Sequence, residues 1–475
     1  MKKILSVLVC AVLTCFVLKG IGRVVEDKDA LIDNLSFYEE AGEYDVLFLG
    51  TSHVHNAIAP VILWQEQGIP SYNLSSAGCR MGMAYWMLRC ALNRTTPKVV
   101  VVDCAYIHYT SKVHGQSGNM HRAFDAIPLS ADKIQAVFDL YEDLEHRVEM
   151  LWPFAFFHDR WNGLTERDFL PVKSLGKGHL LAFDVCPVTI PQVEGTKTEE
   201  PVGVGIPYLR KIAELCKERG IQLMLTFLPF EYDDESEQDM VWLHSFAEEN
   251  GLRYLDGNEL VSVIDERVDY KNGSKNNSHM NWSGAQKIST YIGKVLREQY
   301  DLPDRREDPA YRSWEEGMPA WREEKWVYFR MQEDFYSRLM LAADRDLDVV
   351  IEMNQRDWLE DGTCRALMEN LGIEPEWIGE DTRLILIHGG SGYVDILDGN
   401  GGESCLGKAE IVQEKGKNYT VTLDGKAIYS GKEKSKGQVK ITWLYGEERE
   451  IIDSAAYSYK MAAGEAGKII NATKE

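Results

Sequence analysis

The sequence predicts an α/β fold, a three-layer sandwich whose central parallel sheet is covered by helices on both faces, followed by a smaller α+β domain. Three observations lead to this prediction. Apolar runs such as residues 99–102, four valines in succession, are typical of strands that are buried on both faces. Amphipathic helical segments such as residues 206–219 alternate with these runs. From residue 409 onward the pattern changes to short strands and tight turns.

Residues 1–25 are predicted to form a membrane anchor. Lys2 and Lys3 precede an uncharged, largely apolar run over residues 4–18, and no small-X-small cleavage site follows it. The run is shorter than the ~20 residues that cross a bilayer. It could cross one only if the Lys19 side chain reaches the membrane interface. We therefore expect a single-pass protein of the cell membrane, with its folded part on the extracytoplasmic face.

Composition limits the expected partners and cofactors. The chain has 475 residues and a formal net charge of -23, which argues against nucleic acid or an anionic membrane surface as its main partner. The cysteines are scattered and show no C-x-x-C spacing, so neither a structural zinc site nor a disulfide scaffold is expected. No metal and no cofactor are predicted.

Residues 40–300 are predicted to form the first domain, and residues 29–42 before its first strand are expected to be a polar helical stalk. Short apolar runs predict strands at residues 46–49, 69–74, 99–103, 222–227 and 253–255. Apolar residues at helical spacing, with a capping box of Ser283 and Gln286 for the last helix, predict helices at residues 57–64, 81–92, 206–219, 241–250 and 283–296. Such alternation implies a parallel sheet.

Residues 109–200 interrupt this alternation as a long insertion. It contains a helical segment at residues 132–150, followed by a cluster of aromatic residues between 152 and 161. Two interpretations stay open: the insertion shapes the substrate site, or it is a helical cap with a small core of its own.

Residues 301–343 are predicted to be a linker with a packing helix, and residues 344–462 a mixed α+β domain. The linker, rich in charge, Trp and Pro, is expected to pack against the first domain, with the helix at residues 328–343. The second domain is expected to have strands at residues 348–353, 384–388, 419–423 and 428–429, a helix at 364–371 and a hairpin turn at 424–426.

Ser52 is the candidate nucleophile. It follows the predicted strand at residues 46–49 and the tight turn that Gly50 permits, where open α/β sheets bind ligands. A serine is weakly nucleophilic alone and needs a base, for which the sequence offers His279 more than two hundred residues later. The alternative is that Ser52 is only a helix N-cap and His279 only a loop residue. His53 and His55 lie near Ser52 in sequence and are expected to pack rather than to catalyse.

Three blocks of sequence resemble the SGNH (GDSL-like) hydrolase superfamily, in particular its extracytoplasmic DltD-like branch. Residues 50–53, Gly-Thr-Ser-His, are similar to the block that holds the nucleophile. Residues 73–78, Asn-Leu-Ser-Ser-Ala-Gly, are similar to the block whose glycine N–H helps to form the oxyanion hole, and residues 278–281, Ser-His-Met-Asn, to the block with the catalytic histidine. The resemblance covers residues 40–315, and two further segments, 124–130 and 300–304, are typical of this branch.

The resemblance implies an acyl-ester enzyme with Ser52 as nucleophile, His279 as base, and the N–H groups of Ser52 and Gly78 as the oxyanion hole. The sequence departs from the family at two places. No asparagine follows the strand at residues 99–103, which leaves a side-chain oxyanion donor in doubt. Asn276 stands where the family has the carboxylate that orients the histidine. Three outcomes follow: Asn276 orients His279, an acid such as Asp269 or Asp265 replaces it, or the protein is slow or inactive.

The C-terminal domain resembles the interleukin-like EMT inducer domain. The similar residues are 437–443, Gly-Gln-Val-Lys-Ile-Thr-Trp, and 451–457, Ile-Ile-Asp-Ser-Ala-Ala-Tyr. This implies a binding module, and a purely structural extension is the alternative. The resemblance of the first domain and the membrane anchor imply an esterase or O-acyltransferase that acts on acyl esters, foremost acetyl esters, of envelope or capsular polysaccharide. The expected partners are an acylated glycan or polyol and a membrane-bound acyl-donor protein, and the rival function is that of a non-catalytic glycan-binding surface protein.

Overall fold

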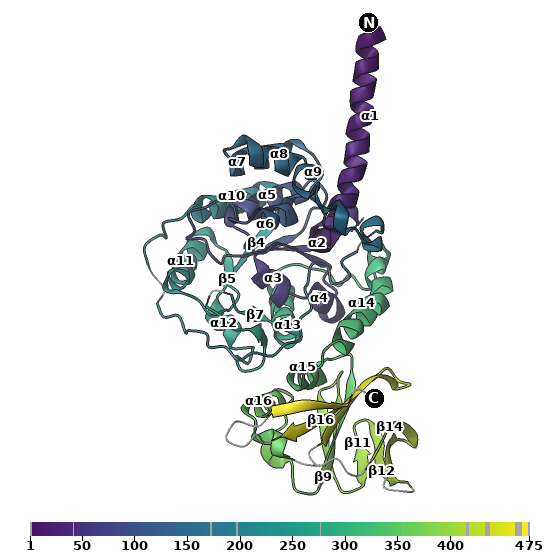
Figure 1. The fold of residues 1–475 in the computed structure, drawn as a ribbon. Coiled ribbons are helices and arrows are strands. Elements are labelled where there is room, and N and C mark those ends of the chain that lie inside the picture. The colour runs from purple at the N-terminus through teal and green to yellow at the C-terminus, as the bar shows by residue number, and fades with distance from the viewer. Residues whose placement is uncertain are drawn as a thin grey trace. The chain divides into compact units, whose positions relative to one another are not determined.

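The computed structural model describes residues 2–40, 42–171, 173–195, 198–275, 277–354, 356–414, 418–432, 438–460 and 468–473. The chain packs into two compact units, each assembled from several segments (Figure 1). The first unit comprises Met1–Leu180, Ile190–Val263 and Gln286–Trp321. The second comprises Leu181–Thr189, Ile264–Ala285 and Arg322–Glu475.

The first unit is built on the predicted five-stranded parallel sheet. Its strands follow one another along the sheet in the order β2-β1-β3-β4-β5, and all neighbouring pairs are parallel. Their bounds are β1 Val46–Gly50, β2 Ser71–Ser75, β3 Val99–Asp103, β4 Gln222–Thr226 and β5 Arg253–Leu255. The order reverses between β1 and β3, and in such sheets ligands bind at the carboxyl ends of the strands at that point.

Helices cover both faces of this sheet (Figure 1). On one face α5 packs against α10, where the Tyr85 and Tyr208 rings lie 5.9 Å apart. On the other face Ser289 Oγ of α13 accepts the N–H of Ala59 at 2.7 Å, which ties α13 to the start of α4. The main helices are α3 Ser52–Ala57, α4 Pro60–Gln67, α5 Met81–Ala91, α10 Gly205–Arg219, α11 Asp234–Asn250, α12 Gly257–Val261 and α13 Trp282–Gln299. This arrangement confirms the α/β sandwich.

The expected stalk is instead a packed helix. Helix α2 spans Lys28–Glu39, and Leu31 and Phe37 on it are buried. Its backbone carbonyl at Asp33 accepts the Tyr72 hydroxyl of β2 at 2.7 Å. The stalk prediction was wrong because the segment is polar on average, although a few apolar residues along it form a stripe that packs on the edge strand β2.

Helix α1, Lys2–Val25, precedes α2. Arg160 of the insertion donates to the carbonyl groups of Val25 and Glu26 at 3.0 and 2.8 Å, which fixes the carboxyl end of α1 on the first unit. Within the described residues, no helix combines the length and the apolar character that crossing a membrane requires.

The insertion is helical and is tied to the face that carries α5 and α10. It contains α6 Ser117–Phe124, α7 Ala131–Leu140, α8 Leu144–Leu151 and α9 Phe154–Phe157. Asp139 of α7 accepts the Trp86 indole N–H at 2.7 Å and the Tyr208 hydroxyl at 2.6 Å. These bonds hold α7 to the helix layer, so the insertion is an extension of the first unit's packing.

Residues 301–343 form more helix than predicted. Helix α14, Arg312–Arg330, continues through Pro319 where a linker was expected. The predicted packing against the first domain does occur, since the Trp314 ring stacks on Trp64 at 5.2 Å. The single helix expected at 328–343 is broken, because the Asp334 side chain accepts the Ser337 N–H at 2.9 Å and so caps a new helix, α15 Phe335–Met340.

The second unit contains the C-terminal antiparallel sheets. A six-stranded sheet has the order β10-β9-β8-β15-β16-β17, and a four-stranded sheet has the order β11-β12-β13-β14. The bounds are β8 Asp348–Met353, β9 Thr382–His388, β10 Tyr393–Asp398, β11 Gly401–Ser404, β12 Gly407–Gln413, β13 Asn418–Leu423, β14 Lys426–Lys432, β15 Gln438–Tyr445, β16 Glu450–Lys460 and β17 Lys468–Thr473, with helix α16 Gly362–Asn370 beside them.

The predicted hairpin turn joins β13 to β14. Leu423 pairs with Lys426, and the two residues between them, Asp424 and Gly425, both have positive φ angles, +49° and +79°. This is the backbone of a type I′ turn, whose twist matches that of the strands. One apolar core lies beneath these strands and includes Val350, Leu386, Ile411, Tyr419, Val421 and Leu444.

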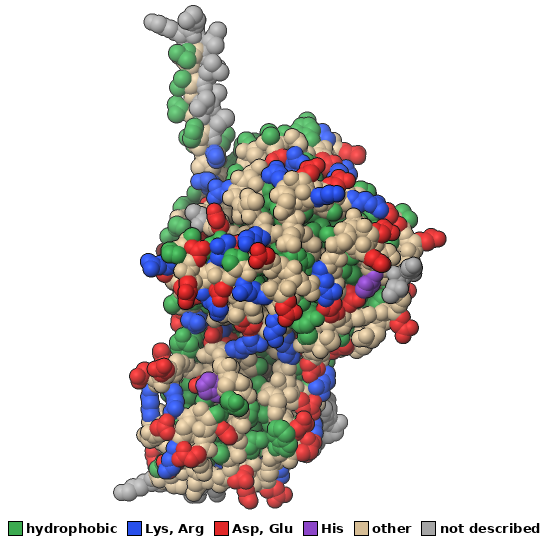
Figure 2. All heavy atoms as spheres, turned by 180° about the vertical axis from the view of Figure 1, so that it is seen from behind, with side chains coloured by type: hydrophobic (Ala, Val, Ile, Leu, Met, Phe, Trp, Pro, Cys, Tyr) green, Lys and Arg blue, Asp and Glu red, His purple; other side chains and the backbone are tan. Residues whose placement is uncertain are grey.

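Acidic and basic side chains are interspersed on the surface of both units, on the face that Figure 2 shows. Many of them form ion pairs, such as Arg89 with Asp132 at 2.9 Å and Arg167 with Asp29 at 3.2 Å.

Candidate functional site

Ser52 begins α3 directly after β1. Gly50 makes this turn possible, because a Cβ atom at that position would lie 2.5 Å from Val54 Cγ2 and 2.8 Å from Asp103 Cβ. Thr51 is the N-cap of α3, and its hydroxyl oxygen accepts the His53 N–H at 3.2 Å. The alternative interpretation of Ser52 as the helix cap is therefore wrong.

Gly78 lies in the turn after β2, next to the turn that carries Ser52. In the parallel register Gly50 pairs with Ser75, and the Ser76 N–H donates to the Gly50 carbonyl at 3.3 Å. Ser52 and Gly78 each follow these paired positions by a few residues, so the structure brings their two turns together in the first unit. Gly78 has a φ angle of +61°, which glycine adopts without strain.

His53 packs, as predicted. Its ring stacks on Phe230 with ring centroids 4.2 Å apart and an interplanar angle of 5°. The Thr51 hydroxyl lies 3.1 Å from its Nδ1 atom. The ring is buried, and these contacts account for its place at the start of α3. His55 is partly exposed, and its carbonyl accepts the Leu180 N–H at 2.7 Å.

Asp103 ends β3, directly behind the Ser52 turn. Its Oδ1 atom accepts the Leu228 N–H at 3.1 Å, and the backbone of Ala105 also donates to this carboxyl. Complete burial outweighs these bonds and raises the pKa of Asp103 to about 7. Both bonds use this carboxyl as an acceptor, and only its protonated form, which this pKa makes available near pH 7 and below, carries a hydrogen that it could donate.

His279 lies in the second unit, in a short strand rather than in the loop that was predicted. Strand β7, His279–Met280, pairs antiparallel with β6, Tyr270–Asn272. The helix that follows is not capped by Ser283, because α13 begins at Trp282 and Asn281 Oδ1 accepts the Gly284 N–H at 3.2 Å. The Asn281 amide also donates to the Val268 carbonyl at 2.8 Å and to the Tyr270 carbonyl at 3.3 Å, which holds the start of the helix against β6 and the residues before it.

Asn272 is the group that faces His279, and the sequence analysis missed it. Its Oδ1 atom lies 3.3 Å from His279 Nδ1, while its Nδ2 donates to the Asn277 carbonyl at 2.6 Å. Because a carbonyl only accepts, the second bond fixes which end of the amide points at the histidine. His279 therefore carries its proton on Nδ1, and Nε2 is the nitrogen with the lone pair. Asn276, the predicted orienting residue, lies outside the described residues.

The only sequence signal for Asn272 is the strand register. Asn272 pairs with His279 across the β6–β7 ladder, seven residues earlier in the chain. Strands of two and three residues are too short for their pairing to be predicted from an apolar pattern. Asp265 and Asp269, the two acids considered for orienting His279, form contacts within the segment before β6. Asp265 binds Arg267 at 2.8 Å, and Asp269 accepts the Asp265 N–H at 2.7 Å.

His279 is neutral at neutral pH. Its pKa is lowered to about 4, chiefly by burial and also by the positive charge of Lys271, while a hydrogen bond to the backbone of Asn277 opposes both. Neutral imidazole can accept a proton, and of these three effects only the backbone hydrogen bond favours the imidazolium that forms when it does so.

Ser52 and Gly78 belong to the first unit and His279 to the second, so their cooperation stays a prediction. Within the described part of the chain, no group of three or more His, Cys, Asp or Glu side chains has an arrangement that could hold a metal ion.

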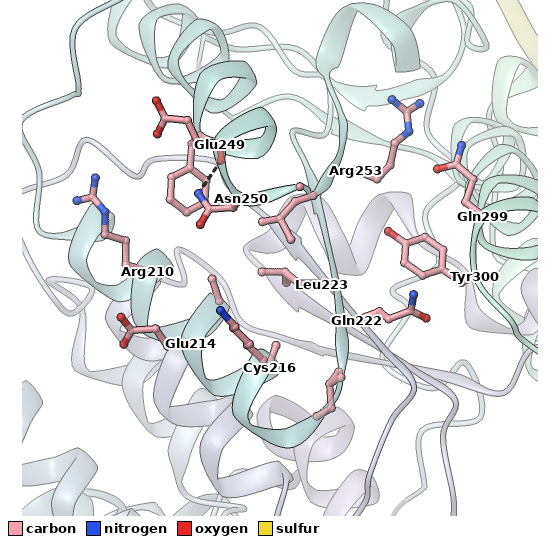
Figure 3. Close-up of a pocket in the computed structure, with 16 residues that line it drawn as sticks. Arg210, Glu214, Cys216, Gln222, Leu223, Glu249, Asn250, Arg253, Gln299 and Tyr300 are labelled. Carbon is pink, nitrogen blue, oxygen red and sulfur yellow. Dashed lines mark hydrogen bonds between the residues drawn. The ribbon is translucent and has the colours of Figure 1, made fainter.

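A cavity of about 1000 Å³ lies at the opposite edge of the sheet, at the amino ends of β4 and β5 (Figure 3). Arg210 and Arg253 border it, but each is engaged by a carboxylate, Glu200 and Glu259 respectively, at 2.5 Å. Cys216 lies at its wall as a buried thiol whose pKa burial raises to about 12. The cavity therefore offers neither an unpaired charge from these arginines nor a reactive nucleophile, and it is not the candidate active site.

No family model matches the chain, and no curated protein matches it. Among solved structures, a Bacteroides fragilis protein described as a "putative acylhydrolase" is similar over 55% of this chain and 92% of its own. The sequence identity is 12% and the TM-score 0.26. A similarity at this level carries no argument about activity, so the assignment of function depends on the site itself.

Proposed function

We propose that this protein is a serine acyl-ester enzyme in which Ser52 is the nucleophile and His279 the general base. The observation that carries the proposal is the state of His279. Asn272 holds the proton on Nδ1, and burial keeps the ring neutral, so Nε2 is prepared to accept a proton. The placement of Ser52 at the carboxyl end of β1, at the reversal point of the sheet, supports it.

The reaction follows from these roles. His279 Nε2 takes the proton of the Ser52 hydroxyl while Ser52 Oγ attacks the acyl carbonyl carbon. The N–H groups of Ser52 and Gly78 stabilise the negative charge that develops on the carbonyl oxygen. When the tetrahedral intermediate collapses, the bond to the leaving alkoxide breaks, and that oxygen takes the proton from His279. Water or another hydroxyl then attacks the acyl-serine by the same steps in reverse.

The acceptor decides between two forms of the activity. Transfer of the acyl group to water makes the protein an esterase, and transfer to a sugar or polyol hydroxyl makes it an O-acyltransferase. The resemblance to the extracytoplasmic DltD-like branch supports acyl esters, foremost acetyl esters, of envelope or capsular polysaccharide as the substrate class. The apolar amino-terminal run supports action at the cell membrane, with a membrane-bound acyl-donor protein as a partner in the transfer form.

Asn272 limits the rate that this site reaches. A neutral amide orients the imidazole but does not stabilise its positive charge, and exchanging Asp for Asn in a serine protease costs about 10⁴ in turnover. We therefore propose a slow enzyme. The same observation favours the second candidate function, a glycan-binding surface protein that keeps the fold without catalysis.

A fluorophosphonate probe, which reacts with activated serines, separates the two functions. We expect it to label the full-length protein, to fail with Ser52→Ala, and to label His279→Ala far more slowly. Ser262→Ala, which removes an exposed hydroxyl at the end of α12, is the matched control and retains labelling. Absence of labelling in freshly prepared, folded wild-type protein supports the glycan-binding function instead.

A further inference from the structure

His114, in the insertion that follows β3, lies against the Gly78 turn. A Cβ atom on Gly78 would be 2.2 Å from His114 Cδ2 and 2.6 Å from His114 Nε2, so the Nε2 edge of the ring faces the glycine. Only a glycine leaves room for this approach. Ser76, in the same turn, donates its hydroxyl to the Asn119 carbonyl at 3.1 Å, which ties the start of α6 and the loop before it to the turn.

The hydrogen bonds of His114 fix where its proton is. The Gln116 N–H donates to Nδ1 at 3.0 Å, and the Asn119 side-chain amide lies 3.1 Å from the same atom. A backbone N–H can only donate, so Nδ1 is the unprotonated nitrogen and the neutral ring carries its hydrogen on Nε2. Burial lowers the pKa of His114 and the nearby Arg80 guanidinium lowers it further, while a hydrogen bond with the backbone of Gln116 opposes both; the net shift of the pKa is downward and favours the neutral ring.

Two N–H donors therefore meet at this turn. The Gly78 N–H and the His114 Nε2–H have no acceptor among the residues that the structure describes. The Arg80 guanidinium is close to this turn but is engaged by Tyr109: it lies over that ring at 3.6 Å from its centroid and has a side-chain hydrogen bond with Tyr109. Nearby donors with no protein acceptor are suited to a negatively charged oxygen.

We propose that His114 is a catalytic residue whose Nε2–H, together with the Gly78 N–H, binds the oxyanion of the tetrahedral intermediate. The proposal rests on the function proposed for Ser52, whose turn lies beside that of Gly78. A neutral imidazole is a suitable donor here, because it stabilises the developing charge without releasing a proton to it; a neutral histidine polarises a substrate carbonyl in this way in triosephosphate isomerase. Arg80 is a positioning residue that keeps the imidazole neutral.

The test compares three variants of the full-length protein by their rates of reaction with the fluorophosphonate probe. His114→Phe keeps a planar ring but loses the donor, and its labelling rate is expected to fall roughly 100-fold. His114→Gln keeps an amide N–H, and we expect it to recover part of the rate. His158→Phe, at an exposed histidine elsewhere in the insertion, is the control and labels as the wild type does. Equal labelling of His114→Phe and the wild type, with unchanged thermal unfolding, overturns the proposal.

A second measurement is independent of Ser52 chemistry. In ¹⁵N spectra of the histidine side chains, His114 is expected to show the neutral Nε2–H form throughout the neutral pH range. Titration with acetate, a small carboxylate, is expected to shift that N–H signal in the wild type and in Ser52→Ala alike. A wild-type protein that resists the probe but shows the acetate shift contradicts the proposed enzyme and leaves the donor site intact. An Nδ1–H form, or no response to acetate, overturns the assignment of His114.

Discussion

The amide oxygen of Asn272 lies 3.3 Å from Nδ1 of His279, on the neighbouring strand of a two-stranded ladder. The amide cannot rotate to present its nitrogen without losing its 2.6 Å bond to the Asn277 carbonyl. In the proposed mechanism this relationship gives His279 a defined orientation as a base but a low strength, because Asn272 carries no charge.

Replacing Asn272 is expected to change the basicity of His279, and with it the rate of probe labelling. Asn272→Asp places a carboxylate at Nδ1, which is expected to raise the pKa of His279 and to speed probe labelling by ten-fold or more. Asn272→Leu removes the acceptor and is expected to slow labelling by a similar factor. Labelling rates of both variants at pH 7 check this, and equal rates would show that Asn272 does not orient the catalytic ring.

The pH dependence of the reaction reports on His279 directly. Because protonated imidazole cannot accept the Ser52 proton, the rate is expected to rise with pH through about 4 and to be level from about pH 5.5 to 7, whereas an unperturbed histidine would give a rise near 6.5. Lys271→Gln removes the nearby positive charge and is expected to move the rise to higher pH. Initial rates of labelling between pH 3.5 and 8 measure both, and a rise that Lys271→Gln leaves in place contradicts the assignment.

Asp103 gives a stability test in the first unit. Its folded-state pKa of about 7 lies above the ordinary 3.8, so between these values the folded chain keeps a proton that the unfolded chain releases. Stability is therefore lost as the pH rises from about 4 to 7. Asp103→Asn keeps the oxygen that accepts the Leu228 N–H but cannot ionise, and we expect it to be more stable than the wild type at pH 8, by up to about 4 kcal/mol. Denaturant unfolding at pH 5 and 8 measures the difference, which should shrink at the lower pH.

Gly50 tests the construction of the Ser52 turn. Gly50→Ala places a methyl group within 2.8 Å of both Val54 and Asp103, and we expect a loss of about 1–3 kcal/mol in the free energy of unfolding. Gly118→Ala in α6, where an added methyl group meets no atom within 4 Å, is the control and is expected to be neutral or slightly stabilising. Equal free energies of unfolding for the two variants would contradict the close approach of Gly50 to Val54 and Asp103.

The parts of the fold that carried a strong local signal were predicted well. The four valines of β3 and the Asp424–Gly425 turn are examples, because continuous apolar runs and residues suited to positive φ act within a few positions of the chain. The prediction failed where long-range packing decides, as for α2, which covers β2, and for the break before α15. In the candidate site, Ser52 and Gly78 follow from turn chemistry. Asn272 and His114 do not, since each is brought to its partner by pairing or by loop placement that no local pattern records.

The second unit has one further consequence, for where the chain can be shortened. The strand that carries His279 is held within that unit by residues from beyond position 340. Trp282 donates its indole N–H to Asp344 at 2.8 Å, and Arg267 binds Glu369 at 2.7 Å. A protein truncated near residue 300 would retain the residues to which the resemblance assigns chemistry, yet it would lose these two contacts, which hold the segment of the proposed base, His279. We expect the probe not to label such a truncated protein, even if its parallel sheet folds. Residues of the C-terminal domain would then be needed to hold His279 in place, and a shortened chain for activity measurements should include them.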